Sequence, residues 1–304
     1  MSAGLSDIMG KLICTVLGCC GIYLCSAQKI PPQLDPRNYP NGTAILLGSE
    51  LLIRAADISE YDVLDTARYV LAYNFTNPYG VKGSDDEGVE TMILEIGRSR
   101  TAFYSRDLFV DDSLYTYKIL KQGRNETYPS NGIRFQIFGD IPKRRLEVVQ
   151  RIPFYSGVAV VISDSPMPQW QVDTLSCDIS GHKCFRARTV FSGRIWTAWF
   201  TPEIPLAVGP WKLWGLPGLI LKAEDSQHIF SFECTSIEEK PGIIKKYKWR
   251  YSTMPHKGWL KLEARMHQTP YTMFGQNTLI IGLGPNPGRK DETWTVPYVP
   301  IEPE

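Results

Sequence analysis

Two side chains with metal-binding chemistry stand two positions apart, at His182 and Cys184. A strand places alternate side chains on one face, so the two share a face if this segment is a strand. Imidazole and thiolate are ligands of Cu(I) and Zn(II). Arg186 and Arg188 follow on the same face, where their charges oppose a bound cation. A copper or zinc site at His182 and Cys184 is therefore one alternative for this segment.

The cysteines offer a second chemistry, a disulfide. Of the seven cysteines, Cys177 and Cys184 flank a polar segment around Gly181, which is typical of a hairpin loop. The two sulfurs would then meet across paired strands, and in an oxidising compartment they would form a disulfide. Closing so short a loop contributes about 2–3 kcal/mol. The bond would also remove the thiolate that a metal site needs. Cys234, by contrast, has the surroundings of a buried small apolar residue.

Motifs of known catalytic sites are not recognisable in the chain. It contains no Gly-x-Ser-x-Gly, no His-Glu-x-x-His and no glycine-rich phosphate loop. None of its four histidines has a nucleophile visibly placed beside it in the sequence. The acidic runs 85–87 and 111–112 have the composition of solvated turns. We therefore assign no catalytic residue and no cofactor, and an envelope hydrolase with an unrecognised site stays an alternative.

The N-terminus has the pattern of a signal peptide. Lys11 precedes an apolar run from Leu12 to Tyr23, and small residues stand at Cys25 and Ala27, before a possible cut after Ala27. The run is shorter than the about 20 residues of a membrane span. We expect a signal peptide at 1–27 and one β-rich domain at 28–304, exported to the periplasm or cell envelope or secreted. A retained anchor and a lipoprotein modified at Cys19 are the alternatives.

The charge of the chain argues against nucleic acid as a partner. The formal net charge is +1, and the densest basic triplet, 143–145, follows Pro142 as a solvated turn would. After removal of the signal peptide, no long apolar run suggests an integral membrane protein.

Hydrophobic periodicity predicts an all-β body. Met92, Leu94 and Ile96 alternate with polar or smaller residues, as in half-buried strands. We expect a mainly antiparallel, large curved sheet or a half-open β-barrel, with one or two short helices. Helical spacing of Trp259, Leu262 and Met266 predicts a helix at 256–268. The predicted strands are 69–75, 92–96, 133–137, 148–152, 158–162, 169–177, 184–191, 194–201, 219–223, 229–235 and 243–251.

The tryptophans are the candidates for a ligand-binding surface. In the strand 194–201, Trp196 and Trp199 fall on opposite faces, and both faces are apolar, so we expect both to be covered. Trp211 and Trp214 follow about ten residues later. Two interpretations stay open: these tryptophans belong to a plain core, or they line an apolar ligand site.

A corner segment, residues 215–220, follows the last two tryptophans. Its residues are Gly215, Leu216, Pro217, Gly218, Leu219 and Ile220. Proline and glycine are turn residues, and the segment carries no acid, base or nucleophile. We expect a structural corner in which Leu216 and Leu219 reach the core. We also expect Gly218 to adopt a backbone angle that other residues disfavour.

The same hexapeptide gives its name to the GLPGLI family, which this chain resembles over most of residues 28–304. The resemblance extends to segments 92–97, 103–105, 170–172, 179–187, 191–205, 209–220 and 298–302. It implies an exported protein of a kind typical of Bacteroidota, without an established biochemical activity, often encoded near TonB-dependent outer-membrane receptors. His182 departs from the usual tyrosine, which favours a tolerated variant over a metal ligand.

Two classes of function follow from these expectations. The first is a binding or accessory module without catalysis, which holds an apolar or peptidic ligand or docks on an outer-membrane receptor. A half-barrel resembling periplasmic lipoprotein carriers would suit it, although that comparison is one of fold alone. The second class is the hydrolase, with the copper or zinc protein beside it.

Overall fold

The computed structural model describes residues 51, 53–78, 88–124, 129–130, 132–162, 165–269, 273 and 298–303. The predicted signal peptide, residues 1–27, and the acidic run 85–87 lie outside these residues. No helix in the described part of the chain has the length and apolar character needed to cross a membrane.

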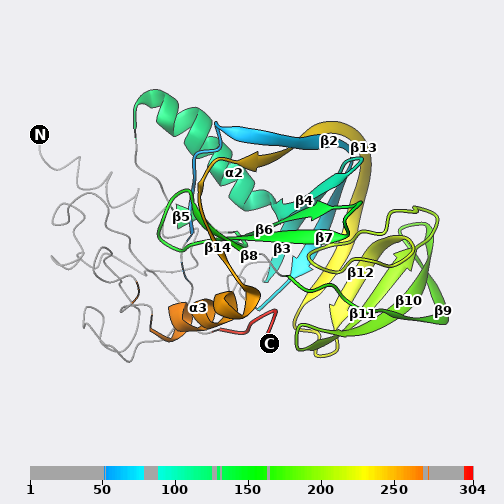
Figure 1. The fold of residues 1–304 in the computed structure, drawn as a ribbon. Helices are drawn as coiled ribbons and strands as arrows, with labels where there is room; N and C mark the ends of the chain where they lie inside the picture. The colour runs from blue at the N-terminus through cyan, green and yellow to red at the C-terminus, as the bar shows by residue number, and fades with distance from the viewer. Residues whose placement is uncertain are drawn as a thin grey trace, which may run out of the picture.

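Twelve of the described strands form one open sheet, which confirms the expected mainly antiparallel β-fold (Figure 1). Their order across the sheet is β14-β8-β7-β6-β4-β3-β2-β13-β12-β11-β10-β9, and only the pair β14 and β8 is parallel. The sheet does not close into a barrel, and β1 and β5 form a separate two-stranded pair. The strands are β1 (Ile53–Arg54), β2 (Tyr61–Thr76), β3 (Val89–Ile96), β4 (Arg100–Ser105), β5 (Pro129–Ser130), β6 (Phe135–Asp140), β7 (Arg145–Arg151), β8 (Val158–Ile162), β9 (Gln171–Ile179), β10 (His182–Phe191), β11 (Arg194–Thr201), β12 (Leu219–Asp225), β13 (Ser231–Tyr247) and β14 (Arg250–Met254).

Two α-helices of the described residues accompany the sheet. The helix α3 (His256–Gln268) has the predicted bounds, with Trp259 and Met266 buried against the main core. The helix α2 (Arg106–Leu114) begins after Ser105, whose Oγ accepts a hydrogen bond from the Leu108 amide at 3.1 Å. It continues through the π-helical turn η3 (Tyr115–Ile119) and the 3-10 turn η4 (Leu120–Gln122). In Figure 1, α2 lies above and α3 below the strands β4, β6 and β7.

Each face of the sheet has its own apolar cluster. The larger cluster spans most of the sheet and includes Phe75 stacked on Phe232, with ring centroids 4.4 Å apart. The smaller cluster lies on the other face and includes Ala102, Phe138 and Val149. Neighbouring positions of β6 thus point to different cores, as strand alternation requires.

The long strand β13 differs from the sequence prediction. Two strands, 229–235 and 243–251, were expected, whereas the structure has one strand, 231–247, paired with β2. The exposed stretch 238–241 ends the apolar alternation, but the backbone pairing continues with a register shift between Glu239 and Gly242. Because such an irregularity tolerates a proline, Pro241 does not end the strand.

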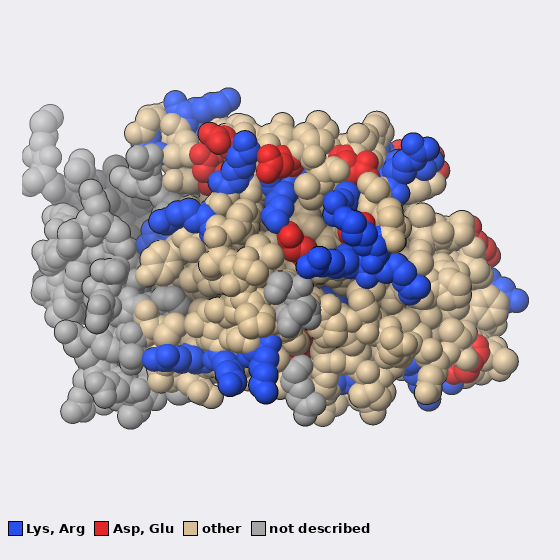
Figure 2. Space-filling model, viewed as in Figure 1, with Lys and Arg blue, Asp and Glu red and all other residues tan. Residues whose placement is uncertain are grey.

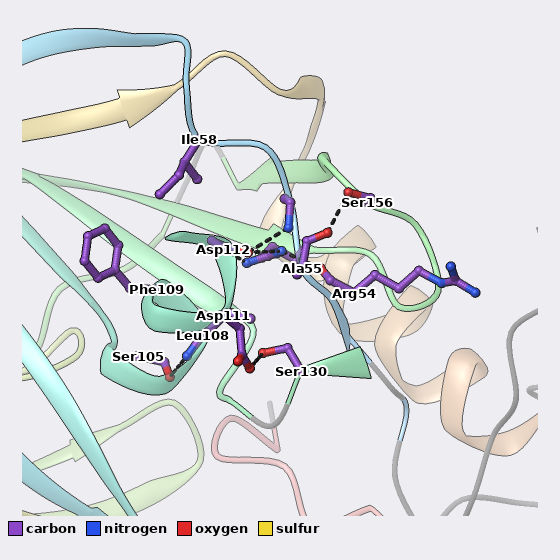
Figure 3. A network of polar contacts seen from close by, with 12 residues as sticks. Arg54, Ala55, Ile58, Ser105, Leu108, Phe109, Asp111, Asp112, Ser130 and Ser156 are labelled. Carbon is purple, nitrogen blue, oxygen red and sulfur yellow. Dashed lines mark hydrogen bonds and ion pairs between the residues drawn. The ribbon is translucent and has the colours of Figure 1, made fainter. Parts of the chain in front are cut away.

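A buried polar network holds the segment before β2 and the helix α2 against the sheet (Figure 3). The carboxylate of Asp112 accepts two hydrogen bonds from Arg151, at 2.8 and 3.1 Å, and one from the Ala56 amide at 2.7 Å. Arg151 also donates to the carbonyl of Arg54 at 2.6 Å. Both charged side chains are 1% exposed. The prediction of a solvated turn at 111–112 is therefore wrong for Asp112, because an ion pair with a residue 39 positions away compensates its burial.

Charges of both signs cover the visible surface. Figure 2 shows Lys and Arg interspersed with Asp and Glu over the upper part of this face. The surface drawn there has no single sign, in keeping with the net charge of +1.

Candidate functional site

The main-core face of the sheet contains a cavity with a volume of about 140 Å³, here called the apolar cavity. The strands β6 and β7 supply the cross-strand pair Phe135 and Gln150. The helix α3 supplies Trp259, Glu263 and His267, whose spacing of four residues places them on one helical face. The other lining residues are Leu51, Ile53, Phe75, Gly132, Ile133, Arg134, Trp211, Phe230, Tyr298, Ile301 and Glu302.

The segment between β11 and β12 brings Trp211 to this cavity. Its indole lies 5.4 Å from that of Trp196 and 5.7 Å from the ring of Phe191, between centroids. Trp211 has φ 52°, a left-handed conformation that bulky residues rarely adopt. Such a conformation persists only where its surroundings impose it, and it is frequent at functional sites.

A buried ion-pair network holds the C-terminal segment 298–303 over the cavity. Lys212, 1% exposed, pairs with Glu302, which also bonds to His256 Nε2. Burial lowers the pKa of Lys212, although the Glu302 carboxylate opposes the shift. Burial alone would raise the pKa of Glu302, but Lys212 and His256 outweigh it and hold that pKa below its ordinary value. Arg194 reinforces the segment by donating to the carbonyl of Pro300 at 2.6 Å.

The charged side chains that line the apolar cavity form ion pairs, and one amide oxygen there has no partner among the described residues. Arg134 pairs with Glu263, and Glu263 also accepts a hydrogen bond from Trp259 Nε1 at 3.1 Å. Gln150 is 9% exposed, and its Oε1 has no hydrogen-bond partner among the described residues. Because an unpaired buried acceptor is costly, this oxygen favours a ligand that brings a donor. The sequence carries no signal for it, since Gln150 lies within an ordinary strand pattern.

The four candidate tryptophans occupy different environments. Trp211 lines the apolar cavity, whereas Trp196 is wholly buried in the core beside it. Trp199 is half-buried on the other face of β11, where Ile195 is 51% exposed. The expectation that both faces of this strand are covered is therefore wrong, because β11 lies in a part of the sheet that packs on one side only. Trp214 is buried, and its carbonyl accepts a hydrogen bond from Trp170 Nε1 at 2.7 Å.

The first half of the corner segment, residues 215–217, lines a separate surface groove together with Trp170 and Trp214. Leu216 and Leu219 are buried. Gly215 has φ 95° and is the residue whose backbone angle needs glycine. Gly218 is required for another reason than the one predicted: a Cβ there would lie 2.2 Å from the Thr201 carbonyl oxygen. The corner is a close approach of two backbone segments.

The predicted disulfide cysteines face each other. Cys177 and Cys184 are register partners in the pair β9 and β10, and both thiols are free in the structure. Directly opposed residues of antiparallel strands have Cα atoms about 4.5–5.5 Å apart. That separation suits a disulfide, which stays a prediction.

The proposed metal ligands His182 and Cys184 are engaged elsewhere. His182 Nδ1 lies 2.9 Å from Glu203 Oε2, and the Cys184 thiol donates to the His182 carbonyl at 3.5 Å. Burial raises the pKa of Cys184 to about 11, which disfavours the thiolate. Within the described ranges, no three His, Cys, Asp or Glu side chains are grouped so as to hold a metal ion.

Comparison with known proteins gives little beyond one family. The family described as "Protein of unknown function (Porph_ging)" matches residues 186–222, from β10 into β12, including the corner segment. No curated protein matches the chain. Two crystal forms of PNGF-II resemble it, with TM-scores of 0.42 and 0.41 and identities of 13% and 14%. The similarity covers 65% of this chain but 33% and 32% of those chains, so this chain spans about a third of their length. Likeness at this level carries no argument about activity.

Proposed function

We propose that this chain is an exported cell-envelope protein of the GLPGLI type, which binds a small apolar or peptidic ligand in the apolar cavity. The observation that carries the proposal is Gln150, whose buried side-chain oxygen has no partner in the described part of the chain and lies at a cavity lined by aromatic rings. A cavity of about 140 Å³ accommodates a group about the size of benzene. The ligand is therefore an aromatic or branched side-chain-sized group next to one N–H or O–H donor, as a peptide provides.

The surroundings of the cavity support binding without chemistry. Arg134 and Glu263 neutralise each other, and Lys212 and Glu302 do the same. Because each charge is already neutralised by its partner, these two ion pairs do not favour a charged ligand. An uncharged ligand follows, with its donor directed at Gln150.

A matched pair of small probes tests this proposal. Phenol and toluene are similar in size, but only phenol has a donor, so phenol should bind more tightly, by about 1 kcal/mol or about fivefold. Titration followed by NMR chemical shifts of the tryptophan indole groups measures both. The variant Gln150→Met keeps the side-chain length and should abolish the preference for phenol.

The control for this experiment lies on the other face of the sheet. Gln136 is also buried with an unpartnered Oε1 among the described residues, but it does not line the apolar cavity. Gln136→Met should leave the phenol preference unchanged. Failure of both probes to bind at millimolar concentration, or a preference that survives Gln150→Met, contradicts the proposal.

Export and partner are separate parts of the proposal. The signal pattern at 1–27 supports cleavage after Ala27. The mass of the N-terminal peptide of the mature protein, purified from a Bacteroidota host, tests this cleavage. The GLPGLI resemblance adds a TonB-dependent outer-membrane receptor as a proposed partner. Cross-linking in the intact envelope tests it, and a mature protein that crosslinks to no outer-membrane receptor contradicts that part alone.

A further inference from the structure

The other face of the sheet contains a second cavity, with a volume of about 250 Å³, here called the polar cavity. Its side chains come from five elements: Glu95 on β3, Tyr104 on β4, Phe109 on α2, Gln136 on β6, and Lys245 and Tyr247 on β13. None of these residues belongs to the apolar cavity. These residues do not form a recognised sequence motif, and only the tertiary structure brings them together.

Gln136 presents an acceptor to the polar cavity that no described residue satisfies. The side chain is 8% exposed, and its Oε1 has no hydrogen-bond partner within the described part of the chain. Strand alternation places Gln136 with Phe138, which also lines the cavity, and opposite to Phe135 and Ile137 of the main core. A buried acceptor without a partner is rare in native proteins, and a bound donor group is one of the ways to satisfy it.

Glu95 provides a group that can both donate and accept. Burial raises its pKa to about 7, although a hydrogen bond with Tyr104 and the charge of Lys245 act in the opposite direction. Near neutral pH the carboxyl group is therefore divided between its two forms. Tyr104 and Tyr247 add hydroxyl groups close by, and burial raises the pKa of both, so they stay protonated.

The charges of the cavity select against ions. Lys245 Nζ lies 4.2 Å from the centre of the Tyr61 ring and opposes a cationic ligand. Glu95 opposes an anionic ligand whenever it is ionised. Because the charges of Lys245 and ionised Glu95 are opposite and offset each other, the cavity has no net charge that would attract an ion, and it suits a neutral molecule with several donors and acceptors of its own.

The walls add a requirement for shape. Phe109 and Tyr104 have ring centroids 5.6 Å apart, and Phe138 completes an aromatic lining. The helix that carries Phe109 is fixed by Asp112, and Figure 3 shows the Phe109 ring directed away from those polar contacts. The wall is thus preorganised, which reduces the entropy lost on binding. Aromatic faces among hydroxyl, amide and carboxyl groups suit a ring with apolar faces and a polar edge.

We propose that the polar cavity is a second ligand site, which binds a neutral, hydroxyl-rich ring of about the size of one sugar unit. Its volume of about 250 Å³ is close to the lower end of the range for small-molecule sites, about 300–1,000 Å³. Gln136 Oε1 accepts a hydrogen bond from a hydroxyl group of the ligand, Glu95 and Lys245 form hydrogen bonds with its other hydroxyls, and Phe109 and Phe138 contact its C–H faces. This site is independent of the apolar cavity and of the function proposed for it.

Neutral and charged sugars of similar size test the second site. The probes are the methyl pyranosides of glucose, galactose and mannose and N-acetylglucosamine, with glucosamine as the cation and the methyl pyranoside of glucuronate as the anion. Binding is followed by saturation-transfer NMR and calorimetry on the full chain. At least one neutral sugar should bind, and the charged analogues should bind about tenfold more weakly or not at all.

Three variants decide whether binding occurs at this site. Gln136→Met should weaken the neutral sugar about tenfold. Phe109→Ala should also weaken it, and since this ring is 38% exposed, its removal leaves the main core intact. Gln150→Met, in the apolar cavity, should have no effect. The proposal is overturned if no neutral sugar binds, if a charged analogue binds as well as the neutral one, or if both Gln136→Met and Phe109→Ala retain full affinity.

Discussion

The two cavities differ in how they handle charge, although adjacent strands supply both. Gln150 of β7 lines the apolar cavity, and Gln136 of β6 lines the polar cavity, each with an unpartnered side-chain oxygen in the described structure. In the apolar cavity the charged groups form closed pairs, Arg134 with Glu263 and Lys212 with Glu302. In the polar cavity no described residue forms such a salt bridge with Glu95, and burial raises the pKa of its carboxyl group to about 7. A glutamine therefore suits different ligands in the two cavities. Its neighbours are paired charges in the apolar cavity and a titratable carboxyl group in the polar cavity.

The largest effect is expected from breaking the ion pair behind the wall of the polar cavity. Arg151→Met leaves Asp112 buried without its partner and should lower the free energy of unfolding by about 3–5 kcal/mol. Urea unfolding measures it. Arg186→Met removes a more exposed pair with Asp173 and should cost at most about 1 kcal/mol. Equal losses for the two variants would show that the buried network does not fix α2.

The next effect concerns pH and separates the two cavities directly. The folded-state pKa of Glu95 is raised from 4.5 to about 7, so the folded protein holds a proton that the unfolded chain releases between these values. This contribution is fully present below pH 4.5 and is lost as the pH rises to about 7, to a total of up to about 3 kcal/mol. Glu95→Gln should flatten the profile of unfolding free energy between pH 4.5 and 7 and stabilise the protein above it. A profile that Glu95→Gln leaves unchanged would contradict the titratable character of the polar cavity.

A smaller effect is expected at the corner segment, and it should reach only the apolar cavity. Gly218→Val places a Cβ against the Thr201 carbonyl and should lower the free energy of unfolding by about 1–3 kcal/mol. Because Trp211 lies in the same connection between β11 and β12 as Gly218, phenol binding should weaken while sugar binding in the polar cavity persists. Gly242→Ala is the control, since a Cβ there makes an ordinary 3.6 Å contact with Ala67 Cβ. An unchanged melting temperature for Gly218→Val would remove the steric explanation.

The smallest effect tests what the two glutamines have in common. Without ligand, Gln136→Met and Gln150→Met each remove a buried amide oxygen that has no partner among the described residues, and each should raise the free energy of unfolding by about 1 kcal/mol. Stability and binding should therefore change in opposite directions, as at many functional sites. Thermal unfolding of both variants in ligand-free buffer measures the gain. A loss of stability in either variant would indicate that its amide already has a partner. The argument for a ligand in that cavity would then fail.

Local periodicity predicted the strands and the helix α3 because both signals lie within a few residues. The bounds of β8, β11 and α3 agree with the sequence prediction, and the buried Trp196 falls on the expected side of β11. The prediction failed where distant partners decide. Asp112 is buried because Arg151 lies opposite it, and β13 continues past Pro241 because β2 pairs with it. No local pattern contains those partners.

The sequence by itself determined the class of fold, its mainly antiparallel sheet and the resemblance that suggests export. It also singled out Trp211, since large aromatic side chains indicate a packed site wherever they gather. Only the tertiary structure decided which residues surround a cavity. Glu95, Tyr104, Gln136 and Lys245 lie far apart in the chain and meet because the order of strands places β3, β4, β6 and β13 together. Strand order depends on long-range pairing. Only that pairing produces the burial that raises the pKa of Glu95 and that leaves Gln136 Oε1 without a partner among the described residues.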